Sequence, residues 1–400
     1  MSVVSIPLCK KNNPDLTMDC ENIQIEIFEK VEKIEVVWSK FAGENIFLST
    51  EYLRNLEENP ADGIIPFYVI IKSGKTPVGI AYFQWKYFQL NENIRENKDA
   101  GKNITEKFKR TVIKNINFPT LICGNLLLTG TYGFVFSENI DKKDQWAYLD
   151  HAIASLTEFL HKHGKPVGLV IAKDFYTSFK ESISQNSFIE FIVQPTMAME
   201  ILPEWQTLDD YINALKSKYR VRFKKAKKDS SHVIKKEFNA DEIQLFQKNI
   251  YDLYENISND ANFNTFMLHE NYFTGLKKHL GDNLTFMTYW LDDKMVGFYT
   301  TIGNGNHLSA HFLGYDKSEN KDCHLYLNML YDIVEQTIHQ KKTHIDFSRT
   351  AIEIKSTIGA VDFPLYLYIK HINPIWNKVV SPVLNLVKPK MDYIIRHPFK

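Results

Sequence analysis

The sequence predicts two consecutive, divergent α/β domains, because the same order of elements occurs twice. Residues 67–83 read as strand, turn, strand, and residues 285–299 repeat this pattern at an offset of 285 − 67 = 218. Residues 148–161 and 326–339 are both predicted helices, at an offset of 326 − 148 = 178. A chance match of single motifs is the alternative interpretation.

Smaller features support the repeat in chain order. A helix precedes each strand pair, and Tyr52 of the first copy corresponds to Tyr272 of the second. The offset between the copies decreases from 218 at the strands to 178 at the second helix. The first copy carries a polar insert, 91–115, where the second has a short turn at 303–306. We therefore expect related domains that differ in one long insertion.

Length and composition agree with two soluble globular domains. A chain of 400 residues is long for one core and suits two of about 200 residues each. An extended segment ends near Leu202, and Thr207 caps a following helix, so we predict domains at 1–203 and 204–400. The first is predicted to be degenerate and structural, the second catalytic.

Charge and cysteine content exclude several function classes. The net charge is +0 at pH 7, so the chain as a whole does not attract nucleic acid, and no DNA partner is expected. The 4 cysteines lack metal-ligand spacing, which predicts reduced thiols and no metal site. Neither a signal peptide nor a membrane span is apparent, so a cytoplasmic location is expected.

The second domain opens with a basic helix. Between Leu208 and Ala226, apolar residues recur at helical spacing and form one stripe. Lysines and arginines lie on the other faces, and no acidic residue follows them until Asp229. A solvated face is one interpretation. The other is a phosphate or polyanion site, because clustered cations repel one another without a counter-charge, and we name Arg220 and Arg222 as its substrate-binding candidates.

Two segments, 214–228 and 345–359, resemble the FemAB-like / BioF2-like branch of the GNAT acyltransferase superfamily. The second reads Ile-Asp-Phe-Ser-Arg-Thr-Ala-Ile-Glu-Ile-Lys-Ser-Thr-Ile-Gly. The resemblance implies two tandem GNAT-like acyl-CoA N-acyltransferase folds that transfer acyl or aminoacyl groups to amines. It also marks Arg349, Glu353 and Lys355 as catalytic candidates, where the two cations would bind phosphate or carboxylate or stabilise developing negative charge.

One departure from the family bears on the donor. The Gly-rich turn that holds the coenzyme A pyrophosphate in ordinary GNAT enzymes should lie at 316–325, and this stretch contains no glycine. A tight nest of backbone N–H groups needs residues that tolerate positive φ. We expect an acyl-CoA or acyl-carrier protein thioester as co-substrate, and the departure favours the carrier protein, or an aminoacyl-tRNA, over coenzyme A.

The two copies differ in polarity along one strand. At the offset of 178, residues 165–171 are mostly apolar, whereas 343–349 carry Asp346, Ser348 and Arg349. Open α/β sheets bind ligands at the carboxyl ends of their strands. Asp346 and Ser348 are therefore substrate-binding candidates, and Arg349 lies at the strand end. A buried Asp346–Arg349 ion pair is the structural alternative.

A second polar strand is predicted at 306–316, and strict alternation places five of its side chains on one face. Acyl transfer to an amine needs a base for the ammonium proton and an acid for the leaving group. His311 has a suitable intrinsic pKa for the base. Candidates for the acid or for hydrogen-bond donation are Tyr315, Tyr366 and Tyr368. The five residues of the predicted face are His307, Ser309, His311, Leu313 and Tyr315.

The last thirty residues, 371–400, are apolar and basic together. Packing over the sheet of the second domain is one interpretation, and contact with anionic lipid at the inner face of a membrane is the other. The second would suit a lipid amine acceptor.

We therefore predict an N-acyltransferase that moves an acyl group from a thioester to a small-molecule, lipidic or cell-envelope amine, with its site in the second domain facing the interdomain cleft. An aminoacyl-tRNA-dependent ligase for peptidoglycan-type peptides is the alternative enzyme, with tRNA as partner. A catalytically degenerate binding protein is the alternative outside the enzymes.

Overall fold

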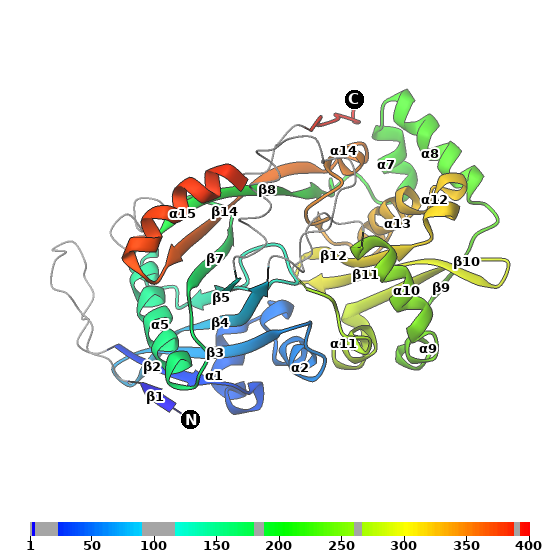
Figure 1. Ribbon diagram of the computed structural model, residues 1–400. Helices are drawn as coiled ribbons and strands as arrows, with labels where there is room; N and C mark the ends of the chain where they lie inside the picture. The colour runs from blue at the N-terminus through cyan, green and yellow to red at the C-terminus, as the bar shows by residue number, and fades with distance from the viewer. Residues whose placement is uncertain (1, 5–22, 90–116, 180–187, 260–265, 388–392) are drawn as a thin grey trace, which may run out of the picture. The chain divides into compact units, whose positions relative to one another are not determined.

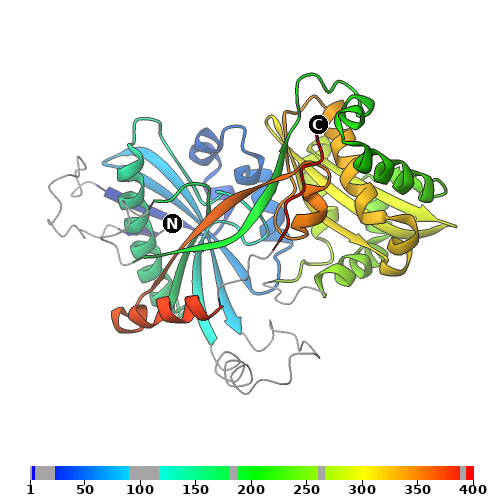
Figure 2. The same ribbon diagram turned by 90° about the horizontal axis from the view of Figure 1, so that it is seen from above.

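The computed structural model describes residues 2–4, 23–89, 117–179, 188–259, 266–387 and 393–400 (Figures 1 and 2). The predicted insert, along with Cys9 and Cys20, lies outside the described residues. The chain forms two compact units. Unit 1 comprises Met1–Gly43, Phe47–Val193 and Leu365–Pro389, and unit 2 comprises Glu44–Ile46, Gln194–Pro364 and Lys390–Lys400. Unit 2 thus begins before the predicted boundary at 203/204, and a late segment of the chain belongs to unit 1.

Unit 1 is a mixed sheet in the order β1-β2-β3-β4-β5-β7-β14, with β6 paired to β4. α5 packs on one face, through residues that contact Phe67 and Val69, and α1 and α2 lie on the other, where Trp38 meets the ring of Tyr68. The elements are β1 (Ser2–Val4), β2 (Ile23–Phe28), α1 (Glu35–Ala42), α2 (Thr50–Glu58), β3 (Ile64–Ser73), β4 (Thr76–Gln89), β5 (Asn117–Cys123), β6 (Phe134–Phe136), α5 (Lys142–Lys162), β7 (Leu169–Phe175), β14 (Val361–His371) and α15 (Pro374–Val387).

Unit 2 repeats this plan in the order β8-β13-β12-β11-β10-β9. α13 packs on one face of the sheet, and α10 and α11 pack on the other. The elements are β8 (Ile189–Glu200), α7 (Leu208–Ala214), α8 (Ser217–Asp229), β9 (Ile234–Glu237), α9 (Ala240–Leu245), α10 (Gln247–Ser258), α11 (Tyr272–Leu280), β10 (Leu284–Leu291), β11 (Lys294–Asn304), β12 (His307–Tyr315), α12 (Lys317–Cys323), α13 (Leu325–His339), β13 (His344–Asp346) and α14 (Ile352–Ser356).

The strand registers confirm the internal repeat. In unit 1, Ile71 pairs with Gly79 and the register shifts directly after Ile71. In unit 2, Tyr289 pairs with Gly297 and the register shifts directly after Tyr289. The shifts are 289 − 71 = 218 residues apart, which is the offset that the sequence pattern predicted. A β-bulge at the same place in both hairpins is more specific than a shared hydrophobic pattern.

The copies differ in the next strand. β4 pairs with β5 and with β6, and between these two strands the chain runs through 124–133. On the corresponding edge, β11 pairs with the continuous strand β12, and the interruption is a bulge in which His311 and Phe312 both lie opposite Thr300. The Thr300 hydroxyl fills the gap, because its Oγ1 accepts from the Phe312 N–H and donates to the Phe312 carbonyl, each at 2.9 Å.

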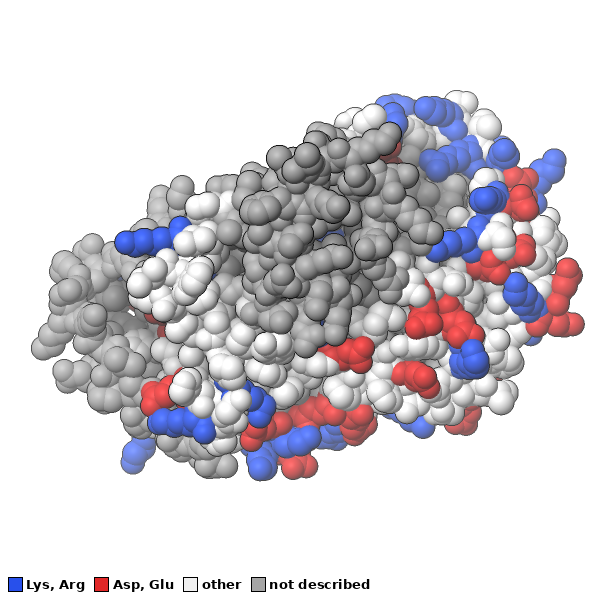
Figure 3. Space-filling view, viewed as in Figure 1, with Lys and Arg blue, Asp and Glu red and all other residues white. Residues whose placement is uncertain are grey.

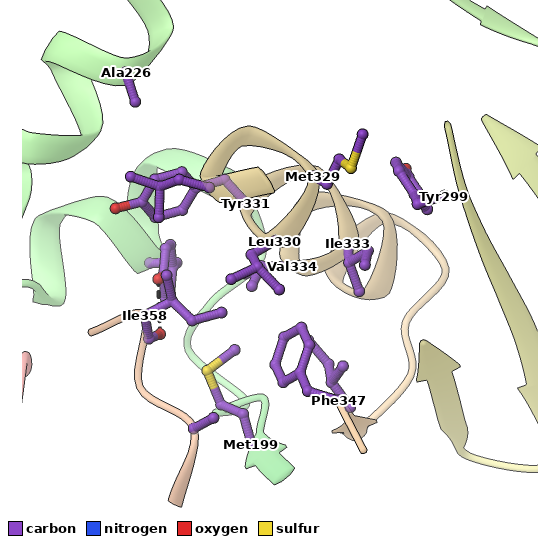
Figure 4. Packing of buried hydrophobic residues seen from close by; sticks show 14 of the residues in the cluster. Met199, Ala226, Tyr299, Met329, Leu330, Tyr331, Ile333, Val334, Phe347 and Ile358 are labelled. Carbon is purple, nitrogen blue, oxygen red and sulfur yellow. Dashed lines mark hydrogen bonds between the residues drawn. The ribbon is translucent and has the colours of Figure 1, made fainter. Parts of the chain in front are cut away.

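The core of unit 2 forms around α13 (Figure 4). This helix carries apolar residues on several faces, so it is packed both by the sheet and by the helices outside it. Met329 and Ile333 are fully buried, and Phe347 and Met199 extend the core beyond the helix. The rings of Phe223 of α8 and Tyr331 of α13 pack edge to face, with their centroids 4.8 Å apart.

The basic helix differs from its prediction. Thr207 is the predicted N-cap, with a capping box to Asp210. The single expected helix is wrong, however, because α7 and α8 are separated at Leu215 and Lys216, both extended. At the break, Leu215 forms a β-bridge with Phe399, and the Lys216 N–H donates to the Pro398 carbonyl at 2.8 Å. Most of the predicted apolar stripe is still buried in unit 2, because each short helix keeps its own face toward α13.

Within the described residues, no helix is both long and apolar enough to cross a membrane.

Candidate functional site

The candidate site of unit 2 lies where two parallel strands separate. β12 and β13 pair from His307–His344 to Ser309–Asp346. β12 then continues to Tyr315, while the chain after Asp346 turns into the segment 347–351. Within the described stretch 266–387, the register of these two strands ends at Ser309, so β13 does not pair with β12 beyond that residue.

The segment 347–351 has an unusual backbone that needs support. Ser348, Thr350 and Ala351 have φ values of 59°, 67° and 48°. Non-glycine residues in this region are strained and persist when surrounding contacts hold them. Lys355 provides those contacts, because its Nζ donates to the carbonyls of Phe347 at 2.7 Å, Ser348 at 3.3 Å and Arg349 at 2.6 Å.

The structure therefore gives Lys355 a positioning role. Its side chain is buried, and burial lowers its pKa to about 7, with Asp346 opposing the change. The Lys355 ammonium donates to three backbone carbonyls, whereas the sequence analysis expected it to bind a phosphate or carboxylate or to stabilise developing negative charge. We infer that Lys355 shapes the segment that carries Arg349.

Asp346 ends β13 and faces the side of the sheet opposite α13. Its Oδ1 accepts from the Thr196 hydroxyl at 3.0 Å and from the Ser348 N–H at 2.8 Å. Burial is the largest influence on this carboxyl and raises its pKa, although both hydrogen bonds favour the charged form. A carboxylate with a raised pKa can accept a proton nearer neutral pH than an ordinary aspartate. Ser348 contributes its backbone to this arrangement.

Arg349 follows directly in the strained segment. Burial lowers its pKa to about 10, so the guanidinium keeps its charge at neutral pH. The site thus combines a carboxyl whose pKa burial raises with a guanidinium that follows the end of a strand.

The prediction that His311 and Tyr315 share one face is wrong, because the bulge at His311 and Phe312 interrupts the alternation. Leu308 and Tyr315 pack in the core around α13. His311 lies on the other face, where its Nε2 is 2.7 Å from the Tyr272 hydroxyl of α11. Burial lowers the pKa of His311 to about 3, so the imidazole is neutral and a poor base at pH 7.

The other predicted catalytic residues lie apart from this opening. Tyr315 packs beside Tyr326, with ring centroids 5.9 Å apart. Glu353 is exposed, accepts from the Ile394 N–H at 3.3 Å and lies 3.9 Å from Arg396. It contacts the end of the chain.

The basic helix is partly compensated. Arg220 donates to the carbonyls of Leu215 and Asn213, which belong to the end of α7 and the residue after it. Lys227 lies 2.5 Å from the buried carboxylate of Asp332. Arg222 lies near Tyr331. Burial raises the pKa of the Tyr331 hydroxyl to about 12, and the positive charge of Arg222 opposes this change. Figure 3 shows the lysines and arginines gathered over α8, and the exposed ones are Lys218, Lys224, Lys225 and Lys228.

A helix occupies the place where a Gly-rich turn was considered. α12 begins at the Asp316 cap, whose side chain accepts from the Ser318 N–H at 3.0 Å. His324 then adopts φ 49° and leads into α13. The Asn328 amide donates to the carbonyls of Cys323 at 3.0 Å and His324 at 3.2 Å. At the start of α13, the Tyr326 N–H donates to Asn320 Oδ1 of α12 at 2.9 Å.

Tyr366 and Tyr368 belong to unit 1, because β14 pairs with β7 there. Tyr368 is fully buried, donates to Glu190 Oε2 at 2.9 Å and accepts from the Phe179 N–H at 2.6 Å. Its contacts are those of a core residue.

The strand registers also correct the comparison between the copies. Ile122 pairs with Ile171 where Ser309 pairs with Asp346, so these strands correspond at 346 − 171 = 175. The earlier offset of 178 equated Ile171 with Arg349. By register, Lys173 and Asp174 of β7 occupy the positions in unit 1 that Ser348 and Arg349 occupy in unit 2.

Sequence reasoning missed this buried pair in unit 1. Lys173 Nζ donates to the carbonyls of Asn125 at 2.9 Å and Leu128 at 2.7 Å, and it also contacts the Asp174 carboxylate. Asp174 has φ 64°. The adjacent Lys-Asp letters after an apolar run were the available signal. Unit 1 is therefore polar at the same strand end, and each unit uses a lysine ammonium to hold the neighbouring backbone.

Among the residues that the structure describes, no group of three or more His, Cys, Asp or Glu side chains is arranged to hold a metal ion.

The order and pairing of these elements define a tandem GNAT-like fold, as predicted. FemX is similar to this chain in structure, with a TM-score of 0.52 and 9% identity over 89% of this chain and 100% of FemX. A tandem GNAT protein from the clavulanic acid biosynthesis pathway gives 0.49 at 8% identity, over 88% and 99% of the two chains. L-PGS from Bacillus licheniformis gives 0.43 at 11% identity, over 84% and 95%.

No protein-family model and no curated protein matches the sequence.

Proposed function

We propose that the protein transfers an acyl or aminoacyl group to an amine, and that the reaction takes place in unit 2 where β12 and β13 separate. The observation that carries the proposal is the end of the β12–β13 pairing at Ser309 and Asp346, where burial raises the pKa of the Asp346 carboxyl. An open strand edge can hold an extended donor by backbone hydrogen bonds. The FemX-like fold supports the proposal, because it provides this strand arrangement.

In this scheme Asp346 accepts a proton from the acceptor ammonium. The neutral amine then attacks the carbonyl carbon of the donor, and the bond from that carbon to the leaving thiolate or alkoxide breaks. As the amide forms, the attacking nitrogen loses a further proton, and the leaving group takes up that proton. Arg349 lies at the strand end, where a positive charge stabilises the oxyanion that forms on the carbonyl oxygen.

The donor under this proposal is an acyl-CoA or acyl-carrier protein thioester, and the acceptor is a small-molecule, lipidic or cell-envelope amine. An aminoacyl-tRNA donor is the second candidate. Two observations favour it over coenzyme A: α12 occupies the place of a phosphate-binding turn, and four exposed lysines of α8 form a cationic surface.

Transfer assays with acetyl-coenzyme A, an acyl-carrier protein thioester and charged tRNA, each with a panel of amines, test the reaction class. Product formation detected by mass spectrometry supports the proposal and identifies the donor. Absence of transfer from every donor supports a binding protein instead.

Arg349→Ala tests the site. Loss of one positive charge at the developing oxyanion is expected to slow single-turnover transfer by about 10²-fold. Arg54→Ala is the matched control, because Arg54 is ion-paired with Glu35 on unit 1 and lies outside the site. If Arg349→Ala reacts at the wild-type rate while its melting temperature falls, Arg349 is structural.

A further inference from the structure

The helix α15 presents large apolar side chains to solvent. It follows β14 in unit 1, and Figures 1 and 2 show it on the outside of that unit. Ile375, Trp376 and Val379 are 76%, 60% and 44% exposed. Positions i, i+1 and i+4 lie on one side of a helix, so the three residues form a continuous apolar face.

The sequence in and around α15 is basic. Lys378 is the only charged residue of α15, and it is exposed. No aspartate or glutamate occurs in the sequence between Asp362 and Asp392, whereas four lysines do. Tryptophan with lysine is the combination that suits a lipid headgroup region, because the indole has an apolar body with a polar N–H, and the lysine stem lies along apolar surface while its ammonium contacts phosphate.

Local hydrogen bonds fix the start of α15 relative to unit 1. The His371 N–H donates to Asn377 Oδ1 at 2.8 Å, and the Ile372 N–H donates to the Gly168 carbonyl at 2.9 Å. The Asn373 side chain accepts from the Ile375 N–H at 2.9 Å. The apolar face is therefore presented in a set orientation, which lowers the entropy lost on docking.

We propose that α15 docks unit 1 onto an anionic lipid surface. Ile375, Trp376 and Val379 enter the boundary between headgroups and acyl chains, and Lys378 contacts the lipid phosphates. This inference concerns where the protein binds, and it does not depend on the reaction proposed for unit 2.

Cosedimentation of the full chain with vesicles tests the docking. One set contains phosphatidylcholine alone and the other adds phosphatidylglycerol, both at low salt. We expect binding to the anionic vesicles and at least fivefold weaker binding to the neutral ones. Trp376→Ser is expected to weaken anionic binding by about tenfold. Lys378→Ala is expected to weaken it by about fivefold, since each basic residue near such a surface contributes about that factor.

Val36→Ser is the matched control, because Val36 is 77% exposed on α1 of the same unit. It should bind as the wild type does. Point substitutions are preferable to truncation, because Phe399 packs against Trp205 and Tyr211 in unit 2 and a truncated chain would lose that contact.

Wild-type protein that stays in the supernatant with anionic vesicles overturns the proposal. Equal binding by Trp376→Ser and the wild type also overturns it. Analytical ultracentrifugation without lipid tests whether a second copy of the chain binds to α15 instead. If Trp376→Ser converts a wild-type dimer to a monomer and leaves vesicle binding unchanged, a second copy of the chain covers α15 and the lipid proposal is wrong.

Discussion

Lys355→Met is expected to lower the free energy of unfolding by about 3–5 kcal/mol, the range for removing one partner of a buried charged interaction. The substitution keeps a long side chain but leaves the carbonyls of Phe347, Ser348 and Arg349 without this donor. Each buried carbonyl that loses its partner costs about 1–3 kcal/mol. Chemical denaturation monitored by circular dichroism measures the loss.

The pH dependence of this effect follows from the lowered pKa. Burial takes the pKa of Lys355 from 10.5 down to about 7 in the folded protein. Between these values the unfolded chain binds the proton and the folded chain releases it, so folding becomes more favourable as pH rises. The stability gap between wild type and Lys355→Met should therefore widen from pH 7 towards pH 10.

Lys225→Met is the control, since Lys225 is exposed on α8 and its replacement should change stability by less than about 0.5 kcal/mol. A loss for Lys355→Met as small as that of the control would show that Lys355 does not hold the segment 347–351.

Asp346→Asn is expected to slow single-turnover transfer by about 10²–10⁴-fold, the usual contribution of a general base. Asparagine keeps the size and can still accept hydrogen bonds, but it cannot take up the amine proton. Because burial raises the pKa of Asp346, the wild-type rate should fall on acidification above the ordinary aspartate range, as the carboxylate becomes protonated. The variant should lose this limb of the pH–rate profile.

Glu353→Gln supplies the comparison, because Glu353 is exposed and contacts the end of the chain. A wild-type rate for Asp346→Asn, with an unchanged pH profile, would assign proton removal to another group.

The repeat and its strand pairs could be predicted from the sequence because they depend on local patterns. Alternating apolar residues and a turn mark each hairpin, and the equivalent positions of Ile71 and Tyr289 keep the same bulge. The fold class follows from this order of elements. The polar end of β13, with Asp346 and Arg349, was also visible as a change in residue type along one strand.

The face of His311 could not be predicted, because a bulge shifts the alternation without a strong local signal. The Thr300 hydroxyl makes two hydrogen bonds to the Phe312 backbone at the bulge. A threonine in a strand does not by itself indicate a bulge. A one-residue shift reverses the face of every later side chain. Tyr315 therefore points to the α13 core and His311 to Tyr272.

Long-range pairing explains the other differences. β14 is far from β7 in the sequence, yet it pairs with β7 and takes Tyr366 and Tyr368 into unit 1. Lys355 was predicted to be a catalytic cation because it lies in the segment that resembles the GNAT family. Its contacts with three backbone carbonyls depend on the positive φ values in the segment 347–351, which the sequence does not indicate.

Hydrogen–deuterium exchange of the full chain tests the location of the site most directly. The protein is compared alone and with each donor in turn: acetyl-coenzyme A, an acyl-carrier protein thioester and charged tRNA. We predict that the productive donor slows exchange of backbone amides in 310–315 and 347–351 of unit 2, and leaves the corresponding segment 124–133 of unit 1 unchanged. Protection confined to unit 1, with no change at the β12 edge, would contradict a reaction site between β12 and β13.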